Sequence, residues 1–278
     1  MTTISLRTAP LRGGLTLPYA EAGYGGTPVV FVHALADSWW SFEPLLRRLP
    51  VSLHGYAPTQ RGHGDADRPA EGYGPEDFAA DLVDFLDTVG IDRAILVGSS
   101  SGGVPARIVA GSHPDRIAGL VLLGTPAALA DKPAMAGLRE AVDGLSDPVP
   151  RAFVEDLMSG MVAGQVAPGL IETMLEQSLK VPAHVWKETL HGLLEADLPA
   201  TLAGILVPTL VIWGDQDGFL PRSDQQTILD AIHGARLITY EGVGHVVHWE
   251  QPERVIADLV EFAARTAPAG SAGAAGTP

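Results

Sequence analysis

The sequence predicts an α/β fold in which a mostly parallel central sheet carries helices on both faces. Short apolar segments suited to buried strands recur along the 278 residues, and helical patterns lie between most of them. Strand alternating with helix is typical of parallel sheets, because a crossover helix returns the chain to the edge at which it started. The strand-like segments are 28–33, 51–57, 94–99, 119–124, 209–213 and 235–240.

The segment 75–89, after the second strand, is a clear helical pattern. Its apolar residues recur at i, i+4, i+7, i+8 and i+11, which places them on one face of a helix. Gly90 follows, where a glycine commonly ends a helix. The apolar residues are Phe78, Leu82, Phe85, Leu86 and Val89.

The end of the third strand carries the pattern G-x-S-x-G, as Gly98-Ser99-Ser100-Ser101-Gly102. In this pattern a sharp strand-to-helix turn exposes the central side chain, and the glycines leave room for neighbouring backbone. The pattern therefore predicts that Ser100 is an exposed nucleophile at the carboxyl edge of the sheet, where ligands of such sheets bind.

The alternation of strand and helix stops between 127 and 198. Helical patterns cover 149–162, 169–179 and 182–196, and no strand pattern appears among them. We predict that 127–198 is a helical cap over the carboxyl edge of the sheet. Ordinary connecting helices are the alternative, but this segment far exceeds the usual length of a connection.

The remaining segments form the predicted core and a tail. Residues 1–126 and 199–266 make up the core, whose size suffices for one large domain. Residues 267–278 are small residues and proline with nothing to bury, so we expect this tail to be disordered.

Composition and charge exclude several classes of partner. The formal net charge is -15, which argues against a nucleic acid or an anionic membrane, since both require a concentrated basic surface. No apolar run approaches the roughly 20 residues that span a bilayer. The chain has no cysteine, hence no thiolate chemistry. Residues 1–12 lack the apolar segment of a secretory signal, so we expect a cytoplasmic protein. The sequence indicates no oligomeric state.

A serine nucleophile requires a general base, and the base requires a third group that fixes its tautomer. Two aspartates, Asp215 and Asp217, directly follow the strand 209–213. His245 follows the strand 235–240 in a glycine-rich turn. Both positions lie beyond strand ends, so we expect these side chains to meet Ser100.

With these motifs the chain resembles the α/β-hydrolases, in particular their capped esterase, lactonase and cofactor-free haloperoxidase-like branch. The resemblance covers about residues 20–265, and it implies an α/β-hydrolase fold with a helical cap. The motifs that carry it, in order, are HALADSWW, QRGHGDADRP, GSSSGG, PTLVIWGDQD and GVGHVVHWEQPE.

The resemblance also implies roles for the site residues. Ser100 is the nucleophile and His245 the general base, which later acts as general acid. Asp217, the second Asp of G-D-x-D, is the acid of the triad, whereas Asp215 braces its turn. Some relatives take the acid from the strand end at 124–126, which here is Gly-Thr-Pro and offers no carboxylate.

The oxyanion hole is expected to use two backbone N–H groups, those of Leu35 and Ser101. Each such donor stabilises the tetrahedral intermediate by about 3 kcal/mol. The sequence departs from the family in this region. The usual His-Gly is His33-Ala34, so we expect a negative φ at Ala34 or a mildly strained alanine. Ser99 stands where His is commoner, and Ser101 where Met or Leu is usual.

The pocket is expected to be apolar and to take a small or medium ester or lactone with an uncharged acyl group. Each of the bulky residues that we assign to it could instead pack in the core. Within the predicted cap they are Phe153, Leu157, Met158, Met161 and Trp186, and beside the catalytic loops they are Trp39, Trp40, Phe219 and Val246.

The predicted reaction is serine hydrolysis through an acyl-enzyme. Perhydrolysis and cleavage of a carbon–carbon bond are alternatives on the same triad, and a ligand-binding receptor of this fold is a further one. Epoxide and haloalkane hydrolysis are disfavoured, because those branches place Asp where this chain has Ser100. His and carboxylate spacings predict no metal site, and no phosphate-binding glycine loop appears, so we expect no cofactor.

Overall fold

A computed structural model describes residues 1–266, apart from the side chains of 133 and 134. These residues form an eight-stranded sheet with the order β1-β2-β4-β3-β5-β6-β7-β8, and the strands from β4 to β8 are parallel. The predicted fold class is therefore confirmed. The parallel strands are β3 (Thr27–Val32), β4 (Leu53–Pro58), β5 (Ala94–Ser99), β6 (Ile117–Leu123), β7 (Thr209–Gly214) and β8 (Arg236–Tyr240). The predicted tail, 267–278, lies outside the described residues.

Two further strands precede the parallel ones. β1 (Ile4–Pro10) pairs antiparallel with β2 (Thr16–Ala22), and β2 pairs antiparallel with β4. The sequence patterns did not predict this hairpin, because β1 lies at the sheet edge with most of its side chains exposed and shows no apolar period. The central strand β5 is buried at all six positions, as expected for a strand covered on both faces.

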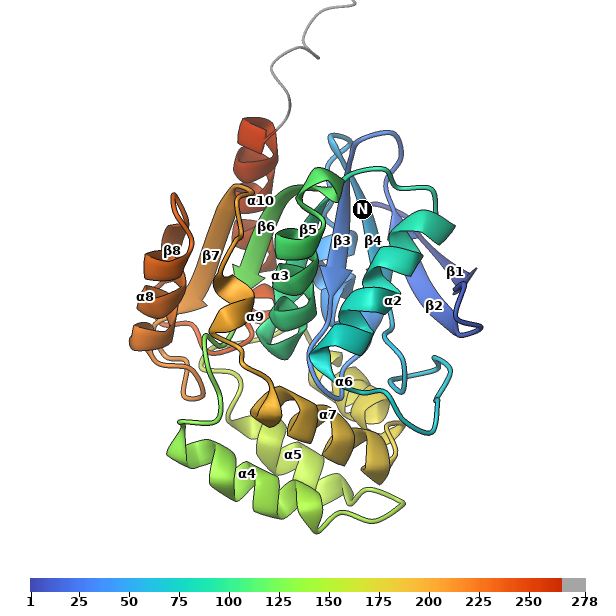
Figure 1. The fold of residues 1–278 in the computed structure, drawn as a ribbon, viewed down its shortest axis with the longest axis vertical. Helices are drawn as coiled ribbons and strands as arrows, with labels where there is room; N and C mark the ends of the chain where they lie inside the picture. The colour runs from blue at the N-terminus through green and yellow to red at the C-terminus, as the bar shows by residue number, and fades with distance from the viewer. Residues whose placement is uncertain (267–278) are drawn as a thin grey trace, which may run out of the picture.

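Helices cover both faces of the sheet (Figure 1). On one face, apolar side chains of α2 (Pro75–Thr88), α3 (Gly103–Ser112) and α8 (Arg222–Ala231) pack against the strands. On the other face, α1 (Glu43–Leu46) and α10 (Pro252–Thr266) do so. The remaining short helices are η1 (Trp39–Phe42), η2 (Ser100–Gly102), η3 (Pro114–Arg116), η4 (Ala200–Leu202) and α9 (Val247–Glu250).

Four helices lie between β6 and β7, beyond the carboxyl ends of the parallel strands (Figure 1). They surround their own apolar cluster, which includes the buried Met174, Val185 and Trp186. The cluster extends to Val246 and Trp249, which follow β8 in the chain. Three of them correspond to the helices predicted in 127–198, and α4 is additional. These helices are α4 (Pro133–Asp143), α5 (Arg151–Ser159), α6 (Leu170–Leu179) and α7 (Ala183–Glu195).

A buried arginine of α3 joins the two ends of this helical segment. The Arg107 guanidinium is fully buried and donates hydrogen bonds to Pro126 O (2.6 Å), Leu198 O (2.8 Å) and Thr201 Oγ1 (2.5 Å). Burial lowers the pKa of Arg107 to about 9. The points where the chain leaves and re-enters the sheet are therefore both connected to the helix that follows Ser100.

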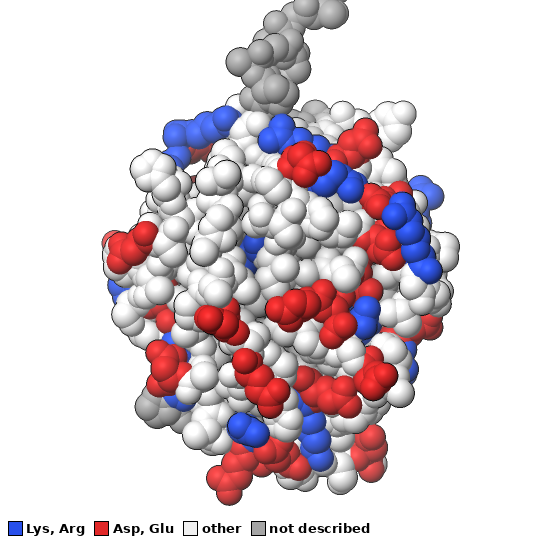
Figure 2. Space-filling model, in the orientation of Figure 1, with Lys and Arg blue, Asp and Glu red and all other residues white. Residues whose placement is uncertain are grey.

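The surface reflects the acidic composition. On the face shown in Figure 2, acidic side chains spread over the middle and lower parts, and the basic side chains lie scattered among them or beside them near the upper edge. None of the helices within residues 1–266 is long and apolar enough to span a membrane.

Candidate active site

The chain turns sharply at the end of β5, and this turn presents Ser100. Ser100 has a φ of 49°, in the left-handed region, which costs of order 1–3 kcal/mol for a residue with a side chain. A Cβ at Gly98 would overlap the backbone of Gly103, and one at Gly102 would overlap the carbonyl of His33. The turn therefore requires both glycines of G-x-S-x-G.

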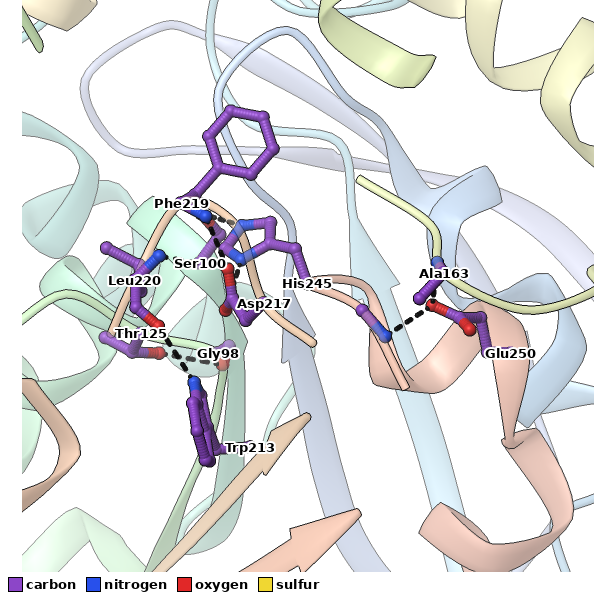
Figure 3. Close-up of polar contacts among 11 residues, drawn as sticks. Gly98, Ser100, Thr125, Ala163, Trp213, Asp217, Phe219, Leu220, His245 and Glu250 are labelled. Atoms are coloured by element: carbon purple, nitrogen blue, oxygen red, sulfur yellow. Dashed lines mark hydrogen bonds and ion pairs between the residues drawn. The ribbon is translucent and has the colours of Figure 1, made fainter. Parts of the chain in front are cut away.

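His245 lies between Ser100 and Asp217 (Figure 3). Its Nε2 is 2.9 Å from Ser100 Oγ, and its Nδ1 is 2.8 Å from Asp217 Oδ2. The Asp217 side chain is fully buried, and His245 is 6% exposed. In this arrangement the carboxylate accepts a hydrogen bond from Nδ1–H, so Nε2 carries no proton and can accept the proton of the Ser100 hydroxyl.

The loop after β7 fixes the Asp217 carboxylate. Its Oδ1 accepts hydrogen bonds from the N–H groups of Phe219 (2.9 Å) and Leu220 (3.0 Å), and Trp213 Nε1 donates to Leu220 O (2.9 Å) (Figure 3). Asp215 is exposed and accepts from Gly242 N–H (2.7 Å), which braces the turn before His245. The structure thus brings Asp217, and not Asp215, to the histidine.

The turn that carries His245 also contacts the segment that follows α5. His245 N–H donates to Met161 O (2.8 Å). The Glu250 carboxylate lies at the same junction (Figure 3) and accepts hydrogen bonds from three backbone N–H groups. These donors are Gly244 (2.9 Å), Ala163 (3.2 Å) and Gly164 (2.6 Å). The position of His245 therefore depends on the helical segment as well as on the sheet.

The two predicted oxyanion donors lie beside Ser100, but they are not equivalent. Ser101 is in the first turn of the helix after β5, where the helix dipole favours an anion. Leu35 N–H already donates to Ser101 Oγ at 2.8 Å. Ala34 does not have a positive φ, which agrees with the first of the two alternatives expected there, and the left-handed alanine of the loop after β3 is Ala36, with a φ of 58°.

A cavity of about 120 Å³ opens beside Ser100 and His245 between the sheet edge and the helices α4 to α7. Apolar side chains dominate its lining. Six of the predicted pocket residues line it, namely Leu157, Met158, Met161, Trp186, Phe219 and Val246.

Three predicted pocket residues lie elsewhere, so their assignment is corrected. The rings of Trp39 and Trp40 stack on each other with centroids 4.2 Å apart. Trp39 belongs to the apolar core on the face of the sheet that α1 and α10 cover, where its large apolar surface is buried. Phe153 packs edge-on against Trp186, with centroids 5.3 Å apart, and does not line the cavity itself.

Asp37, which no sequence pattern singled out, also lines the cavity. Its Oδ1 accepts a hydrogen bond from Ser38 N–H (2.6 Å). Asp37 is 8% exposed, and burial raises the pKa of this carboxyl from 3.8 to about 7. Its place two residues after Leu35, in HALADSWW, was the available signal.

The other histidines near the site serve the fold. His33 Nε2 accepts from Gln60 N–H (2.9 Å) and its Nδ1 bonds Ala34 O (2.8 Å), so the ring orients its own loop. Burial holds the pKa of His33 well below its usual range and lowers that of His63 to about 4 and that of His248 to about 3. All three rings are therefore neutral at pH 7. Among residues 1–266, no three His, Asp or Glu side chains form a cluster that could hold a metal ion.

The chain is similar to proteins of known families over nearly its whole length. It is 31% identical to a non-heme chloroperoxidase of Streptomyces lividans, over 92% of this chain and 98% of that protein. It is 29% identical to a non-heme haloperoxidase of Rhodococcus erythropolis, over 90% and 96%. The fold is similar to that of a thermophilic esterase from Thermogutta terrifontis, with a TM-score of 0.83, 24% identity, and coverage of 94% and 99%.

The model of the alpha/beta hydrolase fold family matches residues 27–252, most of the chain. The matched region begins at β3 and ends at the start of α10, and so includes the loops of Leu35, Ser100, Asp217 and His245. The chain therefore belongs to the α/β hydrolase fold family.

Proposed function

We propose that the protein is a serine hydrolase that cleaves a carboxylic ester or lactone, with Ser100, His245 and Asp217 as its catalytic triad. The observation that supports this proposal is the continuous pair of hydrogen bonds from Ser100 Oγ to His245 and from His245 to Asp217, at 2.9 and 2.8 Å. The distances lie within the reach needed for proton transfer from the nucleophile to its base.

In this mechanism Ser100 Oγ attacks the carbonyl carbon while its proton passes to His245 Nε2. The tetrahedral intermediate collapses to an acyl-enzyme, and the leaving alkoxide takes the proton from His245. Water then gives its proton to His245 as it attacks the acyl carbon, and the acid leaves as Ser100 regains the proton. Asp217 keeps the Nδ1 proton in place and stabilises the imidazolium at both stages.

The cavity supports a small, uncharged acyl group as the substrate portion next to Ser100. Its volume is about 120 Å³, and its walls are mostly Leu, Met, Val and aromatic side chains. Such walls stabilise apolar groups by removing their surface from water, by about 25 cal/mol for each Å². Asp37 is the acidic side chain of this lining, and the burial that raises its pKa to about 7 would equally disfavour a charged acyl group in the same cavity.

Perhydrolysis is the second candidate, because two similar proteins are named as non-heme peroxidases. Hydrogen peroxide would replace water as the nucleophile on the acyl-enzyme, giving a peracid and free Ser100. The triad and the acyl-enzyme are the same in both reactions, so the two differ only in which small molecule reaches the acyl carbon.

Labelling and turnover together test the proposed function. The protein is treated with a fluorophosphonate and the modified peptide is identified by mass spectrometry. Hydrolysis of p-nitrophenyl acetate and of a lactone panel is measured for wild type and for Ser100→Ala, with and without hydrogen peroxide. We expect modification at Ser100 and loss of turnover in the variant. Labelling at another residue, or undiminished hydrolysis by Ser100→Ala, would contradict the proposal, and a peracid product would favour perhydrolysis.

A further inference from the structure

The Ser101 hydroxyl is the hydrogen-bond partner of a backbone N–H that is expected in the oxyanion hole. Leu35 and Ser101 both line the cavity next to Ser100, and Leu35 N–H donates to Ser101 Oγ at 2.8 Å. This N–H is one of two that were expected to bind the carbonyl oxygen. In the structure, the Leu35 N–H is therefore already paired with the hydroxyl oxygen of Ser101.

A serine hydroxyl has two acceptor lone pairs and one proton to donate. The bond from Leu35 uses a lone pair, so the hydroxyl proton remains available. Accepting a hydrogen bond also polarises the O–H group and makes it a stronger donor, by about 10–30%. Ser101 Oγ–H is thus a donor held in place by backbone and located beside the nucleophile.

We propose that Ser101 Oγ–H donates a hydrogen bond to the carbonyl oxygen of the substrate and to the oxyanion formed from it. Leu35 N–H then holds the hydroxyl in place and does not contact the oxygen directly. This inference rests on the proposed function, because it requires an acyl carbon on Ser100. The hydroxyl keeps its proton throughout, so no bond to hydrogen is broken in this step.

The opposite arrangement requires Ser101 to rotate away so that Leu35 N–H can reach the oxyanion. That rotation would break the hydrogen bond that the structure shows. Donation by the hydroxyl keeps this hydrogen bond, so the geometry favours it.

The effect is tested by removing the hydroxyl while keeping its neighbours. Ser101→Ala removes the donor, and the isosteric pair Ser101→Thr and Ser101→Val differs only in the hydroxyl. Ser112→Ala, at the exposed end of α3, removes a hydroxyl outside the site and serves as the matched control. We expect Ser101→Ala and Ser101→Val to lower kcat for p-nitrophenyl acetate by about 10²-fold, the size expected for one oxyanion donor. KM should change little, and Ser101→Thr should retain most of the rate.

A second measurement separates a donor from a structural role. A trifluoromethyl ketone forms a charged hemiketal on the nucleophile, so we expect its inhibition constant to rise in Ser101→Ala by a factor similar to the fall in kcat. The endpoint of fluorophosphonate labelling at Ser100 should still reach one label per chain, which shows an intact site.

Three results would overturn the inference. An unchanged kcat in Ser101→Ala would show that the hydroxyl donates nothing, and a higher kcat would show that it blocks the oxyanion site. If the alanine variant does not fold, equal kcat values for Ser101→Thr and Ser101→Val would likewise show that the hydroxyl donates nothing. Failure of the proposed function gives a different result, since Ser100→Ala would then remain active whatever stands at 101.

Discussion

Replacing Asp217 by asparagine tests whether the carboxylate acts through the tautomer of His245. The asparagine has almost the same shape, so its Oδ1 can still accept the N–H groups of Phe219 and Leu220. The group that faces His245 Nδ1 would then be an amide NH2, which donates. In the variant, Nδ1 would have to accept a hydrogen bond from this amide, so the ring proton would move to Nε2. A protonated Nε2 cannot serve as base for Ser100.

The expected loss follows from this change of tautomer. Removing the charge of a triad acid while keeping its shape lowers kcat by about four orders of magnitude. At 1.36 kcal/mol for each factor of ten, this is about 5.4 kcal/mol of lost transition-state stabilisation. The matched control is Asp215→Asn, in which the exposed carboxylate bonds only the turn at Gly242 and the neighbouring Gln216 side chain. We expect its kcat to stay within about tenfold of wild type, since that turn is solvent-exposed.

The assay is steady-state hydrolysis of p-nitrophenyl acetate, with circular dichroism of both variants to establish folding. A loss in Asp217→Asn that is restored at high pH would also fit, because hydroxide can replace a missing general base. A role for the Asp217 carboxylate in fixing the tautomer would be contradicted if Asp215→Asn were the more damaging change, or if folded Asp217→Asn lost less than about tenfold in kcat.

Three further predictions concern groups outside the triad. Arg107→Met keeps the buried stem but leaves the Pro126 carbonyl without its donor, whereas Leu198 O keeps its hydrogen bonds from Thr201. The free energy of unfolding in urea should therefore fall by about 3 kcal/mol, and a loss below about 1 kcal/mol would contradict this role for Arg107. The folded protein holds the Asp37 proton up to about pH 7, whereas the unfolded chain releases it near pH 3.8. The contribution of this group to the free energy of unfolding is therefore present below pH 3.8 and is lost as the pH rises toward 7. Relative to Asp37→Asn, wild type should therefore lose stability between pH 4 and 7 in urea titrations, and parallel curves would contradict this. Glu250→Ala removes the acceptor of three backbone N–H groups, so we expect faster amide hydrogen exchange at Ala163 and Gly164 and a lower kcat. Unchanged exchange would show that the carboxylate does not hold this segment in place.

The parallel part of the fold could be predicted because burial on both faces leaves a strong signal in the sequence. β5 is apolar through Ala94-Ile95-Leu96-Val97, and the helix at 75–88 shows a clear period ending at Gly90, whose φ is 73°. The edge hairpin could not be predicted in this way. β1 exposes Leu6 and contains charged and polar residues on both faces, so its pairing with β2 depends on backbone hydrogen bonds that no side-chain pattern records.

The candidate site could be predicted as far as chain order and strand ends allow. Ser100, Asp217 and His245 each follow a strand of one parallel sheet, so topology alone brings them to one edge. The side-chain details depend on contacts between distant segments. Leu35 N–H meets Ser101 Oγ across 66 positions, and Phe153 turns its ring to Trp186 instead of the cavity. Periodicity locates Phe153 on a helix but does not say which neighbour it packs against.

The hydrogen bonds of Arg107 have a consequence for protein engineering. At Pro126 and Leu198 the guanidinium bonds main-chain carbonyls, which any amino acid at those two positions would supply. The chain between these positions could therefore be exchanged for a different helical segment without altering the groups that Arg107 requires. We expect chimaeras spliced at 126 and 198 to keep the sheet and the strained turn at Ser100, and to acquire a cavity whose shape is set by the inserted helices.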